Sequence, residues 1–413
     1  MKVEIEDARL ICVNCGRNYE GDTRLFLCPK CGGLLDVVLE NLEWSPKGHG
    51  VWRYGGMLPR PPVEPVTLGE GGTPLVRSRQ HSNLYFKLEG ANPTGSFKDR
   101  GMTLAVTIAL YSNAKSLICA STGNTAASAA AYAARAGLTA NIVLPYNAVA
   151  RGKILQAIAY GARILWISGS FDDAIRHVMK IVELDSRHYP MNSFNPWRLE
   201  GQKTIVFEIH EALSRVDNII YPVGNGGNIA AAGKAISELL AVGVIGEPPR
   251  LIGVQAEGAA PLADAFERGL DRPVFYESPK TVASAIRIGR PVNWSKALRA
   301  VKSTRGAIIK VSDQEIINAQ KVLGWNEGLL VEPASSAAYA GYLKALEQRL
   351  VDKTETTVVV LTGSGLKDPE SLSLIRAREE RVVEGELQQL LSALNKGPTP
   401  MSRETKSTQY PLN

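Results

Sequence analysis

Short apolar runs alternate with longer mixed stretches along most of the chain from residue 73 onward. The runs are rich in Val, Ile and Leu and are bounded by Gly, Pro, Asn or Ser, which is typical of strands buried on both faces. The stretches between them have the length and the apolar spacing of helices. The pattern therefore predicts an α/β protein with parallel sheets. The predicted strands cover residues 84–88, 116–120, 141–144, 163–168, 218–223, 251–256, 307–311 and 357–361, and predicted helices cover residues 151–160 and 172–184 and begin near Asn124 and Ile229.

Turns rich in glycine and small polar residues follow several of these strands. In sheets of this kind, ligands bind beyond the carboxyl ends of the strands. These turns are therefore the candidate binding segments. They cover residues 92–95, 121–125, 224–228 and 362–368.

One lysine stands at such a strand-to-helix junction. Lys98 follows the strand 84–88 and the turn 92–95, and we expect Ser96 to cap the helix that it enters. A lysine gains nothing from the helix dipole in a first turn, because the positive end of the dipole lies there. A partly desolvated lysine amine is a nucleophile toward aldehydes, although most lysines are solvated surface charges. Position alone leaves both interpretations open.

The N-terminal region contains four of the five cysteines. Cys12 and Cys15 form one pair with a two-residue gap, and Cys28 and Cys31 form a second. Four thiolates at this spacing predict a closed tetrahedral structural site for zinc or iron. Two disulfides are the alternative, which the cytosolic character of the rest of the chain disfavours. The fifth cysteine, Cys119, lies inside an apolar strand and is expected to be a core residue.

Composition and charge limit the classes of protein to which the chain could belong. The chain has 413 residues, 45% of them hydrophobic and 21% charged, with a net charge of +6 spread along its length. This charge is too diffuse to predict nucleic-acid binding. No apolar stretch has the length that a membrane span requires, and the first residues do not resemble a signal peptide, so we expect a cytoplasmic protein.

Two segments carry a resemblance to a known family. The sequence Ser-Phe-Lys-Asp-Arg-Gly at 96–101 resembles the cofactor-lysine segment of the fold type II pyridoxal-phosphate enzymes. The longer segment 92–100 and the segment 191–204 are most similar to threonine synthases. The turn 224–228 alone is compatible with plain turn geometry, and beside Lys98 it resembles the phosphate cradle of this family.

The resemblance implies a domain organisation. Fold type II enzymes have two α/β domains with the cofactor between them, and some threonine synthases carry an N-terminal metal module. The expected parts are a zinc-ribbon-like module at 1–40, a Pro/Gly-rich linker at 41–72, a larger domain at 73–96 and 200–374, a smaller domain at 97–199, and a C-terminal helix and flexible tail at 375–413.

The resemblance also implies site residues. Lys98 would hold pyridoxal 5′-phosphate covalently and act as the base, Asn124 would bond the phenolic oxygen of the cofactor, and Thr362 would face its ring nitrogen. Gly224, Asn225, Gly226, Gly227 and Asn228 would hold the cofactor phosphate. Ser121, Thr122 and Thr125 would hold the carboxylate or the distal anion of the substrate, and Lys153, Asn192 and Arg198 would hold its phosphate.

The implied activity is that of threonine synthase, the conversion of O-phospho-L-homoserine and water to L-threonine and phosphate, in a homodimer. Cysteate synthase, which uses O-phosphoserine and sulfite, would keep every cofactor motif. A regulatory or nucleic-acid-binding protein with a decayed site is a third interpretation, which the intact lysine and glycine turn disfavour.

Overall fold

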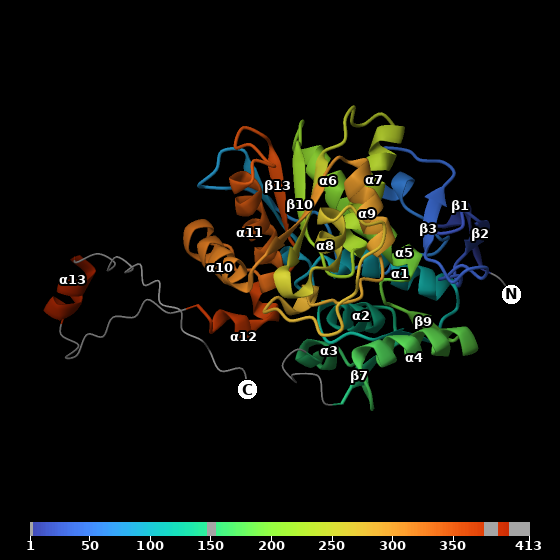
Figure 1. Cartoon of the computed structure of the whole chain (residues 1–413). Coiled ribbons are helices and arrows are strands. Elements are labelled where there is room, and N and C mark those ends of the chain that lie inside the picture. Colours follow the sequence, from blue (N-terminus) through green and yellow to red (C-terminus); the bar gives the residue numbers. More distant parts are fainter. Residues whose placement is uncertain (1–2, 147–153, 376–386, 396–413) are drawn as a thin grey trace. The chain divides into compact units, whose positions relative to one another are not determined.

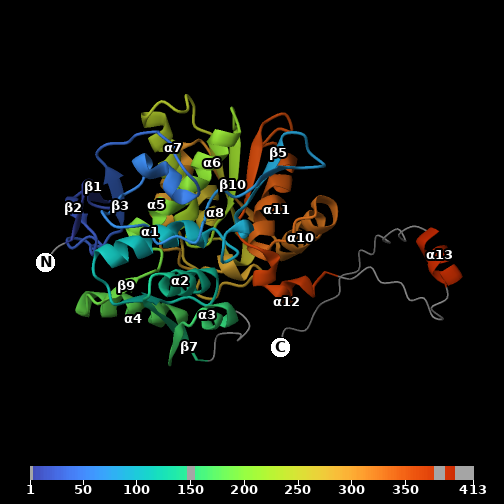
Figure 2. The ribbon, with the colours of Figure 1, turned by 180° about the vertical axis from the view of Figure 1, so that it is seen from behind.

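The computed structural model describes residues 3–146, 154–375 and 387–395. The chain forms two units, residues 1–374 and residues 375–413. The second unit contains helix α13 (Leu387–Asn395), whose leucines are exposed. The first unit contains three sheets, which Figure 1 and Figure 2 show from opposite sides. Among the described helices, none has the length and apolarity that crossing a membrane requires.

The largest sheet has six strands in the order β12-β11-β10-β13-β5-β4, parallel except for the antiparallel pair β4 and β5. Strands β10 and β13 are buried along their whole length, because helices pack on both faces of the sheet. This explains why they read as unbroken apolar runs. The strands are β4 (Leu75–Arg77), β5 (Leu84–Leu88), β10 (Asn218–Pro222), β11 (Arg250–Ala256), β12 (Ala307–Val311) and β13 (Thr357–Leu361).

A second, fully parallel sheet has four strands in the order β8-β7-β6-β9. With α2, α3 and α4 it occupies the lower part of the molecule in Figure 1. Its strands are β6 (Ser116–Cys119), β7 (Thr139–Pro145), β8 (Arg163–Ile167) and β9 (His188–Pro190).

Helices connect and cover both parallel sheets. The α-helices of the first unit are α1 (Lys98–Tyr111), α2 (Asn124–Arg135), α3 (Leu155–Ala159), α4 (Phe171–Leu184), α5 (Pro196–Gln202), α6 (Thr204–Ala212), α7 (Gly227–Ala241), α8 (Pro261–Glu267), α9 (Trp294–Ser303), α10 (Asp313–Glu327), α11 (Pro333–Glu347) and α12 (Pro369–Leu372). Short 3₁₀ helices are η1 (Val51–Met57), η2 (Glu89–Ala91), η4 (Glu257–Ala259), η5 (Ser284–Ile286) and η6 (Gly365–Lys367).

The four-cysteine segment forms a small antiparallel sheet that we call the cysteine module (residues 4–39). Its strands are β1 (Glu4–Cys12), β2 (Asn18–Asp22) and β3 (Leu35–Leu39), in the order β2-β1-β3. The module packs on elements of both parallel sheets. The Tyr189 hydroxyl in β9 donates to the Thr23 carbonyl at 2.9 Å, and Lys296 in α9 forms a 2.6 Å ion pair with Asp36. It is therefore built into the first unit.

The Pro/Gly-rich segment 41–72 runs over the body and contributes to its core. Val51, Tyr54 and Met57 in η1 are buried, and the Tyr54 ring packs on Phe207 in α6. A buried aromatic contact of this kind fixes the path of a segment that has little regular structure.

The predicted strands are confirmed to within two residues at either end, whereas the predicted cap of the first long helix is wrong. Helix α1 begins at Lys98, and Ser96 does not cap it. Ser96 instead pairs through its backbone with Gly363, beyond β13. Asp99 fixes the turn before the helix, because its carboxylate accepts bonds from the Thr94 amide at 2.7 Å and hydroxyl at 2.6 Å. The domain boundaries stay predictions.

Candidate active site

The turns at the carboxyl ends of strands from both parallel sheets enclose a cleft of about 1060 Å³. This placement follows from the fold, because parallel strands bring their carboxyl ends to one edge of a sheet. Lys153 lies outside the described residues. The other predicted cofactor and substrate residues all line the cleft: Lys98, Ser121, Thr122, Asn124, Thr125, Asn192, Arg198, Gly224, Asn225, Gly226, Gly227, Asn228 and Thr362.

The Lys98 amine is half-buried in this cleft. Its nitrogen lies 3.7 Å from the centroid of the Phe97 ring, and it has no hydrogen-bond or ion-pair partner among the residues that the structure describes. Burial, and to a lesser extent the nearby Arg198 guanidinium, lowers the pKa of the amine to about 7, although Glu332 acts in the opposite direction. A large fraction of the amine is therefore neutral near pH 7, the form that attacks an aldehyde.

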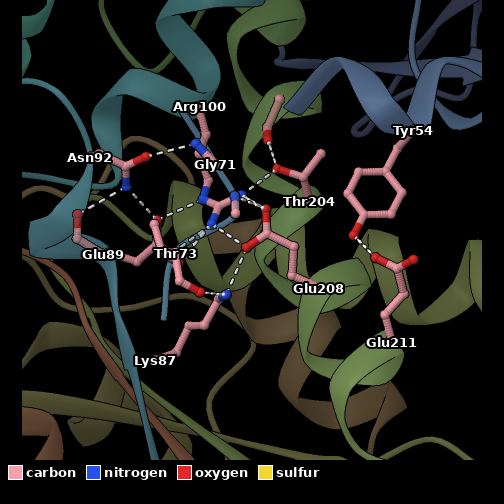
Figure 3. A network of polar contacts seen from close by, with 12 residues as sticks. Tyr54, Gly71, Thr73, Lys87, Glu89, Asn92, Arg100, Thr204, Glu208 and Glu211 are labelled. Atoms are coloured by element: carbon pink, nitrogen blue, oxygen red, sulfur yellow. Dashed lines mark hydrogen bonds and ion pairs between the residues drawn. The ribbon is translucent and has the colours of Figure 1, made fainter. Parts of the chain in front are cut away.

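The neighbours of Lys98 are held in a buried polar network. The Arg100 guanidinium donates to Glu89 at 2.6 and 2.8 Å and to Glu208 at 2.6 and 2.7 Å (Figure 3). Lys87 also donates to Glu208, at 2.6 Å. The network ties the start of α1 to β5 and α6, so it fixes the backbone that carries Lys98.

The glycine turn after β10 lines the cleft. Gly226 has a φ of +79°, a conformation that glycine adopts readily, and it leads into the 15-residue helix α7. A Cβ on Gly224 would lie 3.1 Å from the Ile286 Cα atom. The Asn228 side chain is buried, and both its amide atoms lack a partner among the described residues. Free amides at the start of a long helix are suited to a phosphate group.

Arg198 is a buried cation without an acidic partner among the described residues. Its side chain is 2% exposed, its Nε atom has no hydrogen-bond partner there, and burial lowers the pKa of its guanidinium to about 10. A buried unpaired arginine lowers the stability of the fold unless an anion pairs with it. Asn192 is already engaged, since its amide bonds the Ala120 backbone N–H at 3.0 Å and carbonyl at 2.8 Å. The structure thus gives Asn192 a part in fixing the turn that carries Ser121.

Thr362 lies at the end of β13 and is buried. Its hydroxyl is 3.1 Å from the Ser335 hydroxyl, which accepts the Gly363 N–H at 2.9 Å. The end of β13 therefore contributes a neutral hydroxyl to the cleft lining.

The comparisons with known proteins decide the family. The family model "Pyridoxal-phosphate dependent enzyme" matches residues 66–363. The threonine synthase of Methanocaldococcus jannaschii is 45% identical over 389 residues, which cover 90% of this chain and 95% of that protein. The threonine synthase of Methanosarcina acetivorans is 43% identical over 400 residues, with 93% and 98% covered. The chain belongs to the threonine synthase family of pyridoxal-phosphate-dependent enzymes.

Solved structures agree with a fold type II enzyme. Threonine deaminase isoform 2 from Solanum lycopersicum superposes with a TM-score of 0.63 at 24% identity, covering 73% of this chain and 86% of that one. Maize serine racemase gives 0.61 at 23% identity, covering 78% and 92%. At these identities the likeness shows the fold alone.

The cleft fits the cofactor of this family. Three of its features lack partners among the described residues: the Lys98 amine, the Asn228 amide and the Arg198 Nε atom. A cofactor with an aldehyde and a phosphate would react with the Lys98 amine and bond Asn228, and an anionic substrate would pair with Arg198.

Sequence reasoning did not predict the side-chain positions of three other polar residues of the cleft. Glu332 bonds Asn124, Lys367 donates to the Thr94 carbonyl at 2.9 Å, and Arg287 is exposed at the lining. Lys367 lies within the predicted turn 362–368, and the family resemblance extends to the segment 332–336, but neither signal gives the contact; no sequence pattern indicated Arg287.

The cysteine module brings its four sulfurs together. The Sγ atoms of Cys12, Cys15, Cys28 and Cys31 all lie within 4.8 Å of one another, and all four are free thiols. The Cys12–Cys31 and Cys15–Cys28 pairs are 3.4 and 3.7 Å apart. Four sulfurs placed tetrahedrally at 2.3 Å from a zinc ion would be about 3.8 Å apart. The cluster thus has the donor set and spacing of a metal site, and the disulfide alternative is not found.

Proposed function

We propose that this protein converts O-phospho-L-homoserine and water to L-threonine and phosphate, with pyridoxal 5′-phosphate as cofactor. Relatives named threonine synthase support the substrate class, since they are 43–47% identical over most of the chain. The observation that carries the proposal is that one cleft contains two basic side chains, Lys98 and Arg198, without acidic partners among the described residues. One is suited to an aldehyde and the other to an anion.

The cofactor, when bound, supplies an aldehyde that links to an amine and a ring that withdraws electrons from the substrate α-carbon. Lys98 would form that link and, once the substrate amine replaces it, remove the proton from the α-carbon. The turn from Gly224 to Asn228 would hold the cofactor phosphate through its amides. Asn124 would donate to the phenolic oxygen, and Thr362 would bond the ring nitrogen without enforcing its protonation.

The substrate would lie between two anion subsites. The hydroxyls and amides of Ser121, Thr122 and Thr125, at the start of α2, would hold the carboxylate. Arg198 would hold the phosphate with two parallel bonds, aided by Asn192 and Lys153. Loss of phosphate from the γ-carbon and addition of water at the β-carbon complete the reaction, so the departing phosphate would leave from beside the arginine.

We also propose a metal for the cysteine module and an oligomeric state. The cysteine module would bind a structural zinc ion, because four thiolates leave no open coordination position. The protein would act as a cytoplasmic homodimer.

The test is a measurement of phosphate release from phosphohomoserine and, in parallel, from phosphoserine with sulfite. We expect release from the first substrate, with threonine as the product. Release only from phosphoserine would replace the proposal with cysteate synthesis. Release from neither, by protein loaded with the cofactor, would overturn it.

A further inference from the structure

A carboxylate beside the cofactor-binding residues has no role in the proposed reaction. Glu332 precedes α11, is 4% exposed, and lines the cleft. It forms no ion pair with any residue that the structure describes. Its only side-chain partner there is the Asn124 amide, whose Nδ2 lies 3.1 Å from Oε1 and 3.0 Å from Oε2.

The Glu332 carboxylate is held in place from several sides. Its backbone N–H donates to the Gly363 carbonyl at 3.1 Å, and its carbonyl accepts from the Ser335 N–H at 2.9 Å. A Cβ on Gly363 would lie 2.6 Å from Oε1, so a larger residue there would displace the carboxylate. The N-terminus of the 15-residue helix α11 also favours a negative charge at this position.

An ionised carboxylate accepts hydrogen bonds and cannot donate them. Burial raises the pKa of Glu332, whereas the bond from Asn124 and the nearby Lys98 act in the opposite direction. In its ionised form Glu332 selects the orientation of the Asn124 amide that turns Nδ2 toward it, because the flipped amide would place two oxygens against each other. Since Nδ2 carries two hydrogens, one remains for a group in the cleft. Without Glu332, nothing else among the described residues bonds the Asn124 side chain.

We infer that Glu332 is a positioning residue, which orients the Asn124 amide so that an N–H faces the phenolic oxygen of the cofactor. This inference rests on the proposed function for the cofactor role of Asn124. The charged groups around Glu332 are Lys98 at the start of α1, and Lys367 and Asp368 after β13.

The experiment compares Glu332→Ala, Glu332→Gln, Asn124→Ala and the Glu332→Ala/Asn124→Ala double variant. Two quantities are measured: the affinity for pyridoxal phosphate, and the pH titration of the absorbance of its link to Lys98. We expect Glu332→Ala and Asn124→Ala each to weaken affinity about tenfold, equal to about 1.4 kcal/mol for one hydrogen bond, and to shift the titration in the same direction. Glu332→Gln retains an acceptor oxygen and should stay within about threefold of the wild type.

The double variant is decisive. If Glu332 acts through Asn124, the double variant should be no weaker than Asn124→Ala by more than about twofold. A loss of about a hundredfold, the product of two independent effects, would overturn the inference, as would an unchanged titration in Glu332→Ala. Tyr132→Phe is the control for general loss of stability, because it removes a buried 2.6 Å bond to Glu70 outside the cleft lining. It should lower the melting temperature and leave the titration unchanged.

The two proposals can fail separately. If wild-type protein forms no link at Lys98, the proposed function fails. If it forms the link and the double variant shows independent effects, the positioning role alone fails.

Discussion

Two buried arginines, Arg100 behind Lys98 and Arg198 in the cleft, have opposite surroundings. Arg100 is 0% exposed and meets two carboxylates, Glu89 and Glu208. Although burial lowers the pKa of its guanidinium, the carboxylates raise it well above its usual value. Arg198 is 2% exposed, has no acidic partner among the described residues, and has a pKa lowered by burial. Removing one partner of a buried ion pair leaves the other charge uncompensated, so Arg100 is part of the fold, whereas a buried charge without a partner indicates a ligand site.

The sharpest test of this contrast is the stability of the two methionine variants. Arg100→Met leaves two buried carboxylates without their main partner, so we expect the free energy of unfolding to fall by about 3–5 kcal/mol. The measurement is urea unfolding of cofactor-free protein. Arg198→Met is the matched control and should lose less than about 1 kcal/mol, because it removes a cation that has no partner. Equal losses would mean that the two arginines play the same structural part.

Because Arg198 lacks an acidic partner among the described residues of the cleft, its loss should weaken substrate binding. Arg198→Met should raise KM for phosphohomoserine about a hundredfold, which corresponds to about 2.7 kcal/mol for a lost buried charge pair. Absorbance of the bound cofactor should not change, because Arg198 is expected to contact the substrate phosphate. A parallel loss of cofactor affinity would assign Arg198 to the cofactor site.

The pKa of Lys98 gives a pH-dependent prediction. Cofactor-free protein should link to pyridoxal phosphate at a rate that rises about tenfold per pH unit below pH 7, because only the neutral amine attacks. Above the pKa of about 7 the rate should level off. The measurement is stopped-flow absorbance between pH 5 and pH 10. A rate that keeps rising to pH 10 would indicate an ordinary, solvated lysine.

The smallest effect is expected in the cysteine module. The Tyr19 hydroxyl lies 3.1 Å from the Cys28 sulfur. Tyr19→Phe removes that bond, and we expect about tenfold weaker zinc affinity, since groups that bond metal ligands typically contribute this much. Competition with a chromogenic chelator measures it, and phosphate release by the zinc-loaded variant should equal that of the wild type. Unchanged affinity would contradict a role for Tyr19 at the metal site.

The fold was largely predictable from the sequence, because the central strands of both parallel sheets are short apolar runs buried on both faces. Such runs can be recognised in the sequence without knowing which strands pair. The cysteine cluster was also predictable, since its ligands lie close together in the chain. The Ser96 cap was wrong because a backbone pairing with Gly363, far along the chain, overrides the local preference.

The cleft residues were found through a resemblance, and their contacts could not be predicted. The bond from Asn124 to Glu332 joins residues 208 positions apart, and that from Arg100 to Glu208 joins residues 108 apart. No local pattern encodes such pairs, because they exist only once the two sheets are assembled. The same limit applies to Asn192, whose amide bonds the Ala120 backbone.

Borohydride reduction of the cofactor-loaded protein, followed by peptide mapping, tests the central claim most directly. The account predicts one stable pyridoxyl group, on the peptide that contains Lys98, and none in Lys98→Ala. A pyridoxyl group on another lysine, or an equal yield from Lys98→Ala, would contradict it.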